Sequence, residues 1–267
     1  MNGTVEVVES VPSAFADLVS VRLAEGTDER RGAGTGLSLF LSGGPTAEAC
    51  YRQLAARSGP QSGESPGDRP GDRPGDRPRV DWTAVDVYLG DERCVPPDDP
   101  DSNHRMVAEV LLGAVGPVRS DHPMYRYGSP DQAATDYQQL LDPLGPFDVV
   151  HLGMGPDGHC ASLFPDSAAL GVEDPEVLVM ANRDPHAHNP HDRITLTLAA
   201  IARARLVVFT VSGDSKGDAF RRLVAGDDLP AARVTAGEVI WLADAGAVGD
   251  TRIPAGSDRS APDRPPG

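Results

Sequence analysis

Lysine is almost absent from this chain of 267 residues, in which Lys216 is the single lysine among 24 basic side chains. Basic residues of either kind are outnumbered by 40 acidic ones, and the formal net charge is −16. Nucleic acids and anionic membranes bind basic surfaces, so this composition argues against both as partners. A small anionic ligand remains compatible with it if a local cluster of positive groups overrides the overall sign.

Cysteine and long apolar runs are also scarce. The three cysteines (Cys50, Cys94 and Cys160) are too few for a disulfide framework and are typical of reduced thiols. No run of 18 apolar residues predicts a membrane span, and the first residues lack the basic and apolar regions of a secretory signal. We therefore expect a soluble, cytoplasmic protein.

Two segments have little to bury. The tetrapeptide PGDR occurs three times between Pro66 and Pro78, within a Ser/Gly/Pro-rich stretch at about 58–79, and the tail at 249–267 has a similar composition. Turn-forming and charged residues of this kind favour disorder. We expect one domain over 1–248, interrupted by a disordered insertion and followed by a disordered tail.

The rest of the chain alternates between two patterns. Short apolar runs rich in β-branched residues are separated by amphipathic stretches, as in βαβ units. The sequence predicts an α/β fold: a mostly parallel, doubly wound, Rossmann-like sheet with helices on both faces. The predicted strands are 36–41, 85–89, 147–152, 178–181, 206–211 and 239–242, and the predicted helices are 13–24, 47–56, 102–112, 131–141 and 216–224.

Ligands of such sheets bind beyond the carboxyl ends of the strands, so the residues after each strand matter most. Two strands lead through a glycine turn into a helix. One turn holds Ser42, Gly43, Gly44 and Thr46, and the other runs from Ser212 to Lys216. Backbone N–H groups and a helix N-terminus there favour an anion, although a tight turn with a helix cap is the simpler alternative.

The other two strand ends carry charged and titratable side chains. Asp91 and Arg93 follow one strand and either hold a polar substrate or form a solvated ion-pair cluster. Asp157 and His159 lie in the glycine-rich loop after another strand, where the histidine is a candidate general base. This loop contains a formal G-x-G-x-x-G, but Pro165 leaves little room for the helix of a dinucleotide site.

Two further patterns are weaker. His186, His188 and His191 form an H-x-H-x-x-H cluster, but it lies in an Asn/Pro-rich loop without the spacing of a structured metal site. Cys160 follows His159 directly, and adjacent residues rarely form a nucleophile–base pair, so we interpret Cys160 as a packing residue. We predict no metal and no cofactor.

Taken together, the motifs resemble the glucosamine-6-phosphate isomerase/6-phosphogluconolactonase family. They are LSGGPT, GDERCVPPDDPDSN, FDVVHLGMGPDGHCASLFP, RITLTLAAIARARLVVFTVSGDSK and LPAARV, spread in order from about Leu37 to Leu242. The isomerase branch continues differently after the Gly-His pair, where this chain has Ser162-Leu163-Phe164-Pro165. The resemblance therefore favours the lactonase branch.

This resemblance implies hydrolysis of 6-phospho-D-glucono-1,5-lactone in the oxidative pentose phosphate pathway, without a cofactor. It implies that His159 is the general base and that Asp91 and Arg93 are the polar pair of the GDER loop. The groups that it assigns to phosphate or substrate are Gly43, Gly44, Thr46, Arg93, Arg193 and Lys216. Pro45 departs from the family pattern, since it removes one backbone N–H from the first turn.

Three alternatives remain at this point: a deaminase-type isomerase, a sugar-phosphate sensor without catalytic activity, and a nicotinamide-dependent enzyme suggested by the glycine string alone. We expect a monomer or a weak homodimer.

Overall fold

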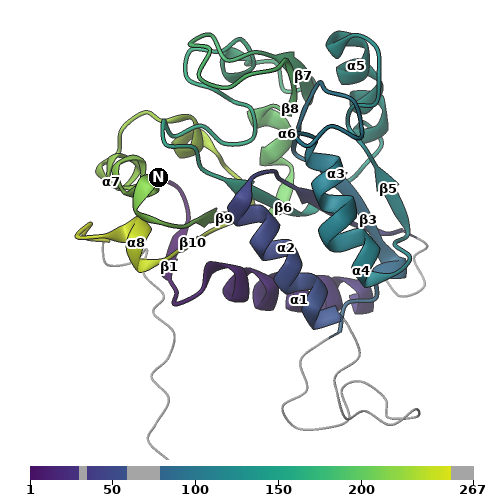
Figure 1. Cartoon of the computed structure of the whole chain (residues 1–267), viewed down its shortest axis with the longest axis horizontal. Coiled ribbons are helices and arrows are strands. Elements are labelled where there is room, and N and C mark those ends of the chain that lie inside the picture. The colour runs from purple at the N-terminus through teal and green to yellow at the C-terminus, as the bar shows by residue number, and fades with distance from the viewer. Residues whose placement is uncertain (30–34, 59–78, 254–267) are drawn as a thin grey trace, which may run out of the picture.

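The structure, a computed structural model, describes residues 1–29, 35–58 and 79–253. Most of the predicted insertion and tail (59–78 and 254–267) lies outside the described residues. A central sheet of seven parallel strands has the order β1-β10-β9-β6-β2-β3-β5 (Figure 1). Its strands are β1 (Thr4–Val7), β2 (Leu37–Leu41), β3 (Val85–Leu89), β5 (Ser120–His122), β6 (Phe147–Gly153), β9 (Ala204–Val211) and β10 (Glu238–Ala243).

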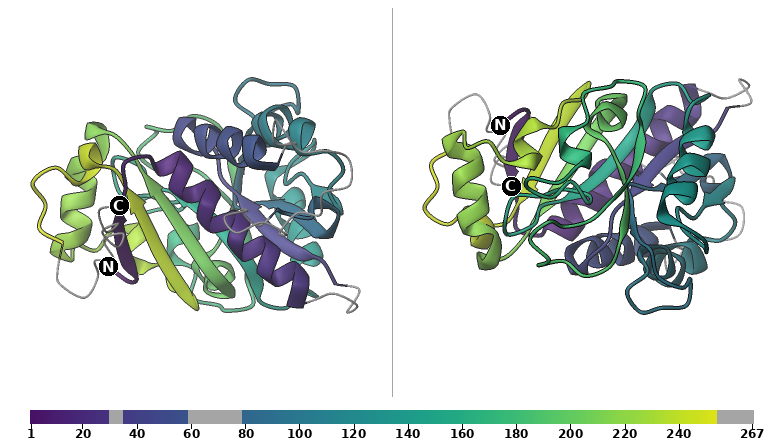
Figure 2. Two further views of the ribbon diagram at one scale, coloured as in Figure 1. Left: turned by 90° about the horizontal axis from the view of Figure 1, so that it is seen from below. Right: turned by 90° about the horizontal axis from the view of Figure 1, so that it is seen from above.

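The predicted α/β class is confirmed, and the helices lie on both faces of the sheet. Helix α1 crosses one face diagonally, as the left view of Figure 2 shows, and α6 lies on the other. The α-helices are α1 (Val11–Glu29), α2 (Pro45–Ser58), α3 (Asn103–Val107), α4 (Gly113–Val115), α5 (Pro130–Leu141), α6 (Leu198–Ala202), α7 (Gly217–Ala225) and α8 (Ala245–Val248). The turn between α3 and α4 (Ala108–Leu112) is a π-helix, and short 3-10 turns cover Trp82–Ala84, Ala169–Gly171, Asp214–Lys216 and Pro230–Arg233.

Burial explains why these elements form. Every residue of β2 and of β3 is buried, because helices cover the sheet on both sides. In α1 the buried side chains recur at helical spacing, which turns one stripe of the helix to the sheet. They are Val11, Phe15, Ala16, Val19 and Leu23.

A second, smaller sheet was not predicted. Its three antiparallel strands have the order β4-β8-β7 and comprise β4 (Asp91–Arg93), β8 (Arg193–Leu196) and β7 (Val179–Asn182). The apolar run at 178–181 therefore forms a strand, as expected, but in this antiparallel sheet and not in the parallel one. β7 lies against α5 as well as β8.

The strand order reverses between β2 and β6. From β2 the chain continues to β3 on one side, and from β6 it continues to the small sheet and β9 on the other. A crevice forms at such a reversal, beyond the carboxyl ends of the strands. No helix within the described ranges is long and apolar enough to cross a membrane.

Candidate active site

A cavity of about 550 Å³ opens at this reversal point. Its walls are the turns that follow β2, β6 and β9, together with β4 and β8 of the small sheet. All the predicted site residues except Asp157 line it: Ser42, Gly43, Gly44, Thr46, Asp91, Arg93, His159, Arg193 and Lys216. The structure thus brings together side chains that are more than 170 positions apart in the chain.

The turn after β2 leaves its backbone donors available. Gly44 has φ +96°, a conformation that glycine adopts without strain. The amides of Gly43 and Gly44 make no hydrogen bond to the described residues. Helix α2 starts at Pro45, where the missing N–H removes a donor that the first turn of a helix would leave unpaired anyway. The turn therefore retains two main-chain donors for an anion despite the proline.

Gly43 also makes room for a neighbour. A Cβ at this position would lie 1.9 Å from Oδ1 of Asn103. That oxygen accepts a hydrogen bond from Arg93, and Nδ2 of Asn103 donates to the main-chain oxygen of Asp91 at 2.9 Å. Asn103 therefore packs against the glycine turn and at the same time holds Arg93 by a hydrogen bond.

The small sheet places two arginines opposite each other. In the antiparallel pairing of β4 with β8, Arg93 is in register with Arg193, and both line the cavity. Like charges directly across a strand pair destabilise it, so an anion between them would relieve the repulsion. Burial lowers the pKa of Arg193, although the nearby Asp91 carboxylate opposes this shift. Nε of Arg193 is buried and has no hydrogen-bond partner among the described residues.

The two carboxylates of the GDER loop have different positions. Asp91 faces the cavity and accepts a hydrogen bond from the Ser162 hydroxyl at 2.6 Å. Glu92 instead points toward the start of α3, where it accepts from the amides of Arg93, Asn103 and His104. Burial raises the pKa of Glu92, and these three hydrogen bonds oppose the rise. Glu92 therefore anchors the loop, and Asp91 belongs to the site.

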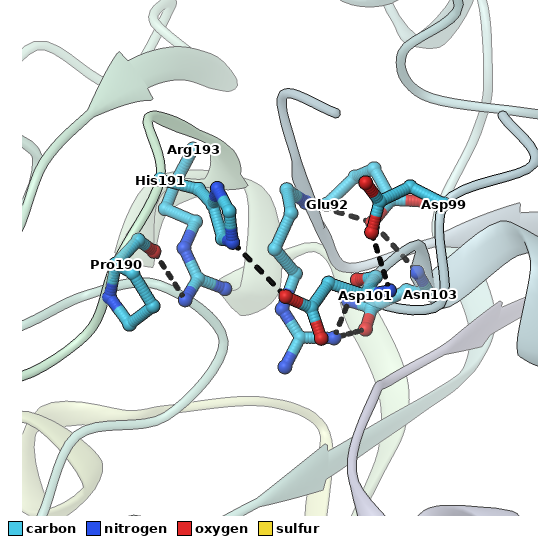
Figure 3. A network of polar contacts seen from close by, with 8 residues as sticks. Glu92, Asp99, Asp101, Asn103, Pro190, His191 and Arg193 are labelled. Carbon is cyan, nitrogen blue, oxygen red and sulfur yellow. Dashed lines mark hydrogen bonds and ion pairs between the residues drawn. The ribbon is translucent and has the colours of Figure 1, made fainter. Parts of the chain in front are cut away.

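A polar contact joins the loop before β8 to the loop after β4. Nε2 of His191 lies 3.0 Å from Oδ2 of Asp101, and Nη2 of Arg193 donates to the Pro190 oxygen at 3.0 Å (Figure 3). His186 contacts a different carboxylate, that of Asp166. The His186 and His188 rings stack with centroids 6.0 Å apart, but His191 contacts a different carboxylate, so the three histidines do not converge. Within the described ranges, no three side chains of the metal-binding types form a group.

The loop after β6 presents a histidine held by a carboxylate. Nδ1 of His159 lies 2.5 Å from Oδ1 of Asp157, and His159 lines the cavity. Burial raises the pKa of Asp157, but the hydrogen bond and the charge of His159 outweigh it and leave this pKa below its usual value. A Cβ on Gly155 would lie 2.2 Å from the imidazole. The ring therefore needs glycine at 155, and Nε2 remains for the substrate.

The same loop lacks the continuation of a dinucleotide site. The residues after Gly158 form turns and an isolated bridge between Cys160 and Leu163, and the next helical turn begins only at Ala169. Cys160 is 1% exposed and packs in the core, as predicted. Burial raises the pKa of its thiol well above the usual range, which disfavours a thiolate nucleophile.

The turn after β9 is partly filled by a side chain of the protein itself. Two of its donors are engaged by Asp244, which accepts from Oγ of Ser212 at 2.5 Å and from the Gly213 amide at 3.0 Å. The Ser212 hydroxyl and the Gly213 amide are therefore already engaged, since the side chain of Asp244, 31 positions after Gly213, accepts from both; the expectation of a second anion-binding turn stays a prediction. Lys216 nevertheless lines the cavity; burial lowers its pKa, and the charge of Asp157 opposes that shift.

Several cavity residues were not predicted from the sequence. They include Asn103, Phe164, Asn189 and Thr210. Phe164 packs edge-on against His159, with ring centroids 5.0 Å apart. Asn103, Phe164 and Thr210 fall inside the quoted motifs, which were the available signal, whereas Asn189 lies outside them and carried none.

Comparison with known proteins agrees with this geometry. The family model described as glucosamine-6-phosphate isomerases/6-phosphogluconolactonase matches residues 9–241. The chain belongs to this family. A protein named 6-phosphogluconolactonase from Mycobacterium tuberculosis is 40% identical over 183 residues, which cover 62% of this chain and 73% of that protein. The one from Synechocystis is 35% identical over 85% of this chain and 88% of its own length.

The family fold is also found among solved structures. The crystal structure of 6-phosphogluconolactonase from Thermotoga maritima superposes with a TM-score of 0.70 at 25% identity, covering 91% of this chain and all of that one. The family members thus share the sheet and its reversal point with this chain.

Proposed function

We propose that this chain hydrolyses 6-phospho-D-glucono-1,5-lactone to 6-phospho-D-gluconate, a step of the oxidative pentose phosphate pathway. The lactonase names of its relatives support this activity. The observation that carries it is the position of His159: the ring is held by Asp157 and lines the same cavity as Arg93, Arg193 and Lys216. A general base and a cluster of cations are what an anionic ester requires.

The reaction needs a water molecule, a base and an acid. Nδ1 of His159 donates to Asp157, so Nε2 takes a proton from the water that attacks C1 of the lactone. Asp157 stabilises the imidazolium that results. The tetrahedral intermediate then collapses, the C1–O5 bond breaks, and the imidazolium returns its proton to the departing ring oxygen. No covalent intermediate forms, because a lactone is already an activated ester.

The phosphate provides a remote anchor. Lys216, Arg93 and the amides of Gly43 and Gly44 hold it, with the hydroxyls of Ser42 and Thr46 beside them; all these residues line the cavity. Such binding energy orients the lactone ring against His159. Arg193 and Asp91 lie next to Arg93 on the small sheet, where Asp91 accepts from a sugar hydroxyl and Arg193 donates to the developing oxyanion.

The experiment is a coupled assay with freshly generated lactone, corrected for spontaneous hydrolysis. We expect His159→Ala to lose about 100- to 10,000-fold in kcat, the range for a lost general base. His186→Ala is the matched control, since that histidine also pairs with an aspartate but does not line the cavity. Near-normal turnover by His159→Ala would refute the mechanism.

Three further measurements separate the alternatives. A deaminase-type isomerase would release ammonia from glucosamine 6-phosphate, and a sensor would bind phosphosugar without hydrolysing the lactone. A nicotinamide enzyme would bind the dinucleotide in a titration. The cytoplasmic location, the absence of a cofactor, and the monomeric or weakly dimeric state stay predictions.

A further inference from the structure

A buried network of hydrogen-bonded side chains lies beneath the cavity and takes no part in the mechanism above. It consists of Tyr51 on α2, His151 on β6 and Thr210 on β9, each at most 3% exposed. The Tyr51 hydroxyl lies 2.7 Å from Nδ1 of His151, and Nε2 of His151 lies 2.9 Å from Oγ1 of Thr210. Buried polar groups cost free energy unless each forms a hydrogen bond with another. The direction of each hydrogen bond in this network therefore matters.

The two ends of this hydrogen-bond network reach different walls of the cavity. At one end, the Tyr51 hydroxyl accepts from the Ser42 amide at 2.6 Å, and Ser42 opens the glycine turn. At the other end, Thr210 lines the cavity and pairs in the sheet with Gly153, where the loop of His159 begins. Since β6 lies between β2 and β9, the network spans three adjacent strands at the reversal point.

Both tautomers of His151 can satisfy the ring and the Tyr51 hydroxyl, and the distances favour the one with the proton on Nε2. Complete burial lowers the pKa of His151 to about 3, so the ring is neutral and has one N–H. Burial also raises the pKa of Tyr51 well above its usual value, so its hydroxyl keeps its proton. The Ser42 amide already donates to this hydroxyl, and Nδ1 of His151 at 2.7 Å is a nearer acceptor than the Ser42 oxygen at 3.1 Å. The ring N–H then lies on Nε2 and donates to Thr210.

We propose that Tyr51 is a positioning residue that, through the Nε2–H tautomer of His151, fixes the turn from Ser42 to Thr46 so that its amides face the phosphate. The inference rests on the proposed phosphate role of that turn. Without the hydroxyl, the Ser42 amide would be buried without a partner, and the turn would shift to recover one. Phe15, with its ring centroid 4.3 Å from that of His151, restricts the imidazole from turning.

The test compares two lactones in the intact protein. We expect Tyr51→Phe to raise KM for the phosphorylated lactone about five- to tenfold, the effect of losing one buried hydrogen bond. Unphosphorylated gluconolactone should show unchanged KM, and kcat should stay within about twofold for both. Thr210→Val should show the same pattern more weakly, and Thr210→Ser should restore the wild-type KM.

Ser38→Ala is the matched control, since Ser38 is a buried hydroxyl at the other end of β2 that bonds Asp148. It should lower stability without changing either KM. Equal KM increases for both lactones in Tyr51→Phe, or no increase, would overturn the proposal. Nitrogen-15 NMR of the wild-type protein is independent of any variant's folding: a pyrrole-like Nε2 on His151 supports the proposal, and a pyrrole-like Nδ1 overturns it.

Lys216→Ala, assayed in parallel, separates this inference from the function on which it rests. If Lys216→Ala raises KM for the phosphorylated lactone and Tyr51→Phe does not, the positioning role alone is wrong. If neither variant distinguishes the two lactones, the phosphate role of the whole site is wrong.

Discussion

The two glycine turns of the cavity resemble each other in sequence and differ in what they can bind. Both follow a buried strand, and both lead into a helix. The amides of Gly43 and Gly44 have no partner among the described residues, whereas the Gly213 amide and the Ser212 hydroxyl donate to Asp244. The carboxylate of Asp244 occupies in the second turn the place that we propose for a phosphate oxygen in the first. A turn motif therefore becomes an anion site only if the protein itself brings no acceptor to it.

The second turn contributes a side chain to the cavity in place of its amides. Asp244 also caps α8 by accepting from the Ala247 amide at 2.8 Å, so the turn from Ser212 to Lys216 is rigidly attached to that helix. The free turn offers donors, and the filled turn offers an anchored ammonium group. This difference assigns the two turns distinct functions.

The largest effect is expected from closing the free turn. Gly43→Ala would place a Cβ where Oδ1 of Asn103 now lies, which displaces the partner of Arg93. We expect about a 100-fold loss in kcat/KM, as for a misplacement of about 1 Å near the reacting groups. Gly213→Ala is the control: nothing lies within 4 Å of the new Cβ, but φ +87° and ψ 156° are nearly confined to glycine, so we expect a stability loss of about 1–3 kcal/mol and a smaller loss of activity. Equal activity losses in both variants would contradict the comparison.

A smaller effect is expected from removing the ammonium group of the filled turn. Lys216→Ala should raise KM for the phosphorylated lactone roughly 10- to 100-fold, the range for a lost charge-assisted hydrogen bond, and should leave the unphosphorylated lactone nearly unaffected. Lys216→Arg should recover only part of this loss, because a guanidinium group differs in shape and reach from an ammonium group. Steady-state kinetics on both lactones measure the contrast. Similar increases for the two substrates would show that Lys216 does not bind phosphate.

Removing the Asp244 carboxylate should make donors of the turn from Ser212 to Lys216 available to a ligand. Asp244→Ala removes the cap of α8, which should lower the free energy of unfolding by about 1–2 kcal/mol. It also releases the Gly213 amide, so KM for the phosphorylated lactone should fall about twofold, as expected for one added weak donor. Asp81→Ala removes a comparable cap, at Thr83, outside the cavity and should change stability alone. An unchanged KM in Asp244→Ala would mean that the released donors do not reach the substrate.

The smallest effect is a pH dependence. Burial raises the pKa of Asp244, but the hydrogen bonds from Ser212 and from three backbone amides lower it more, so it lies below the usual value of 3.8. A lowered folded-state pKa stabilises the fold above the unfolded value, and this contribution is lost as the pH falls through the folded value. The difference in unfolding free energy between wild type and Asp244→Asn should therefore be constant above about pH 5 and shrink below about pH 4. A difference that grows on acidification would contradict the shift.

Much of the fold could be predicted because buried strands and amphipathic helices leave clear periodic patterns. Four strands were missed: β1 (Thr4–Val7) and β8 (Arg193–Leu196) alternate over only four residues each, and β4 and β5 lack such patterns. β4 is three polar or charged residues, and β5 is Ser-Asp-His at the sheet edge. β4 forms only because β8, about 100 positions later, supplies its hydrogen bonds. No local sequence pattern predicts a pairing between strands so far apart in the sequence.

The site was predictable to the extent that its residues follow strands. The residues at the ends of β2, β6 and β9 line the cavity as expected, since parallel strands bring their carboxyl ends to one edge. The hydrogen bond of Asp244 to the turn and that of Tyr51 to Ser42 depend on side chains brought close by the tertiary fold. Their residue types are ordinary in a sequence, so only the structure shows that one turn is filled and the other is braced.

The register of Arg93 with Arg193 has a consequence for the empty protein. Two arginines in register, and a buried Nε without a partner among the described residues, are unfavourable unless an anion lies beside them. A ligand that supplies negative oxygens there binds the folded chain and has no such site on the unfolded one. Substrate and product therefore act as folding ligands, and the melting temperature should rise with their concentration. In a cell, this enzyme would be most resistant to unfolding and proteolysis when flux through its reaction is high.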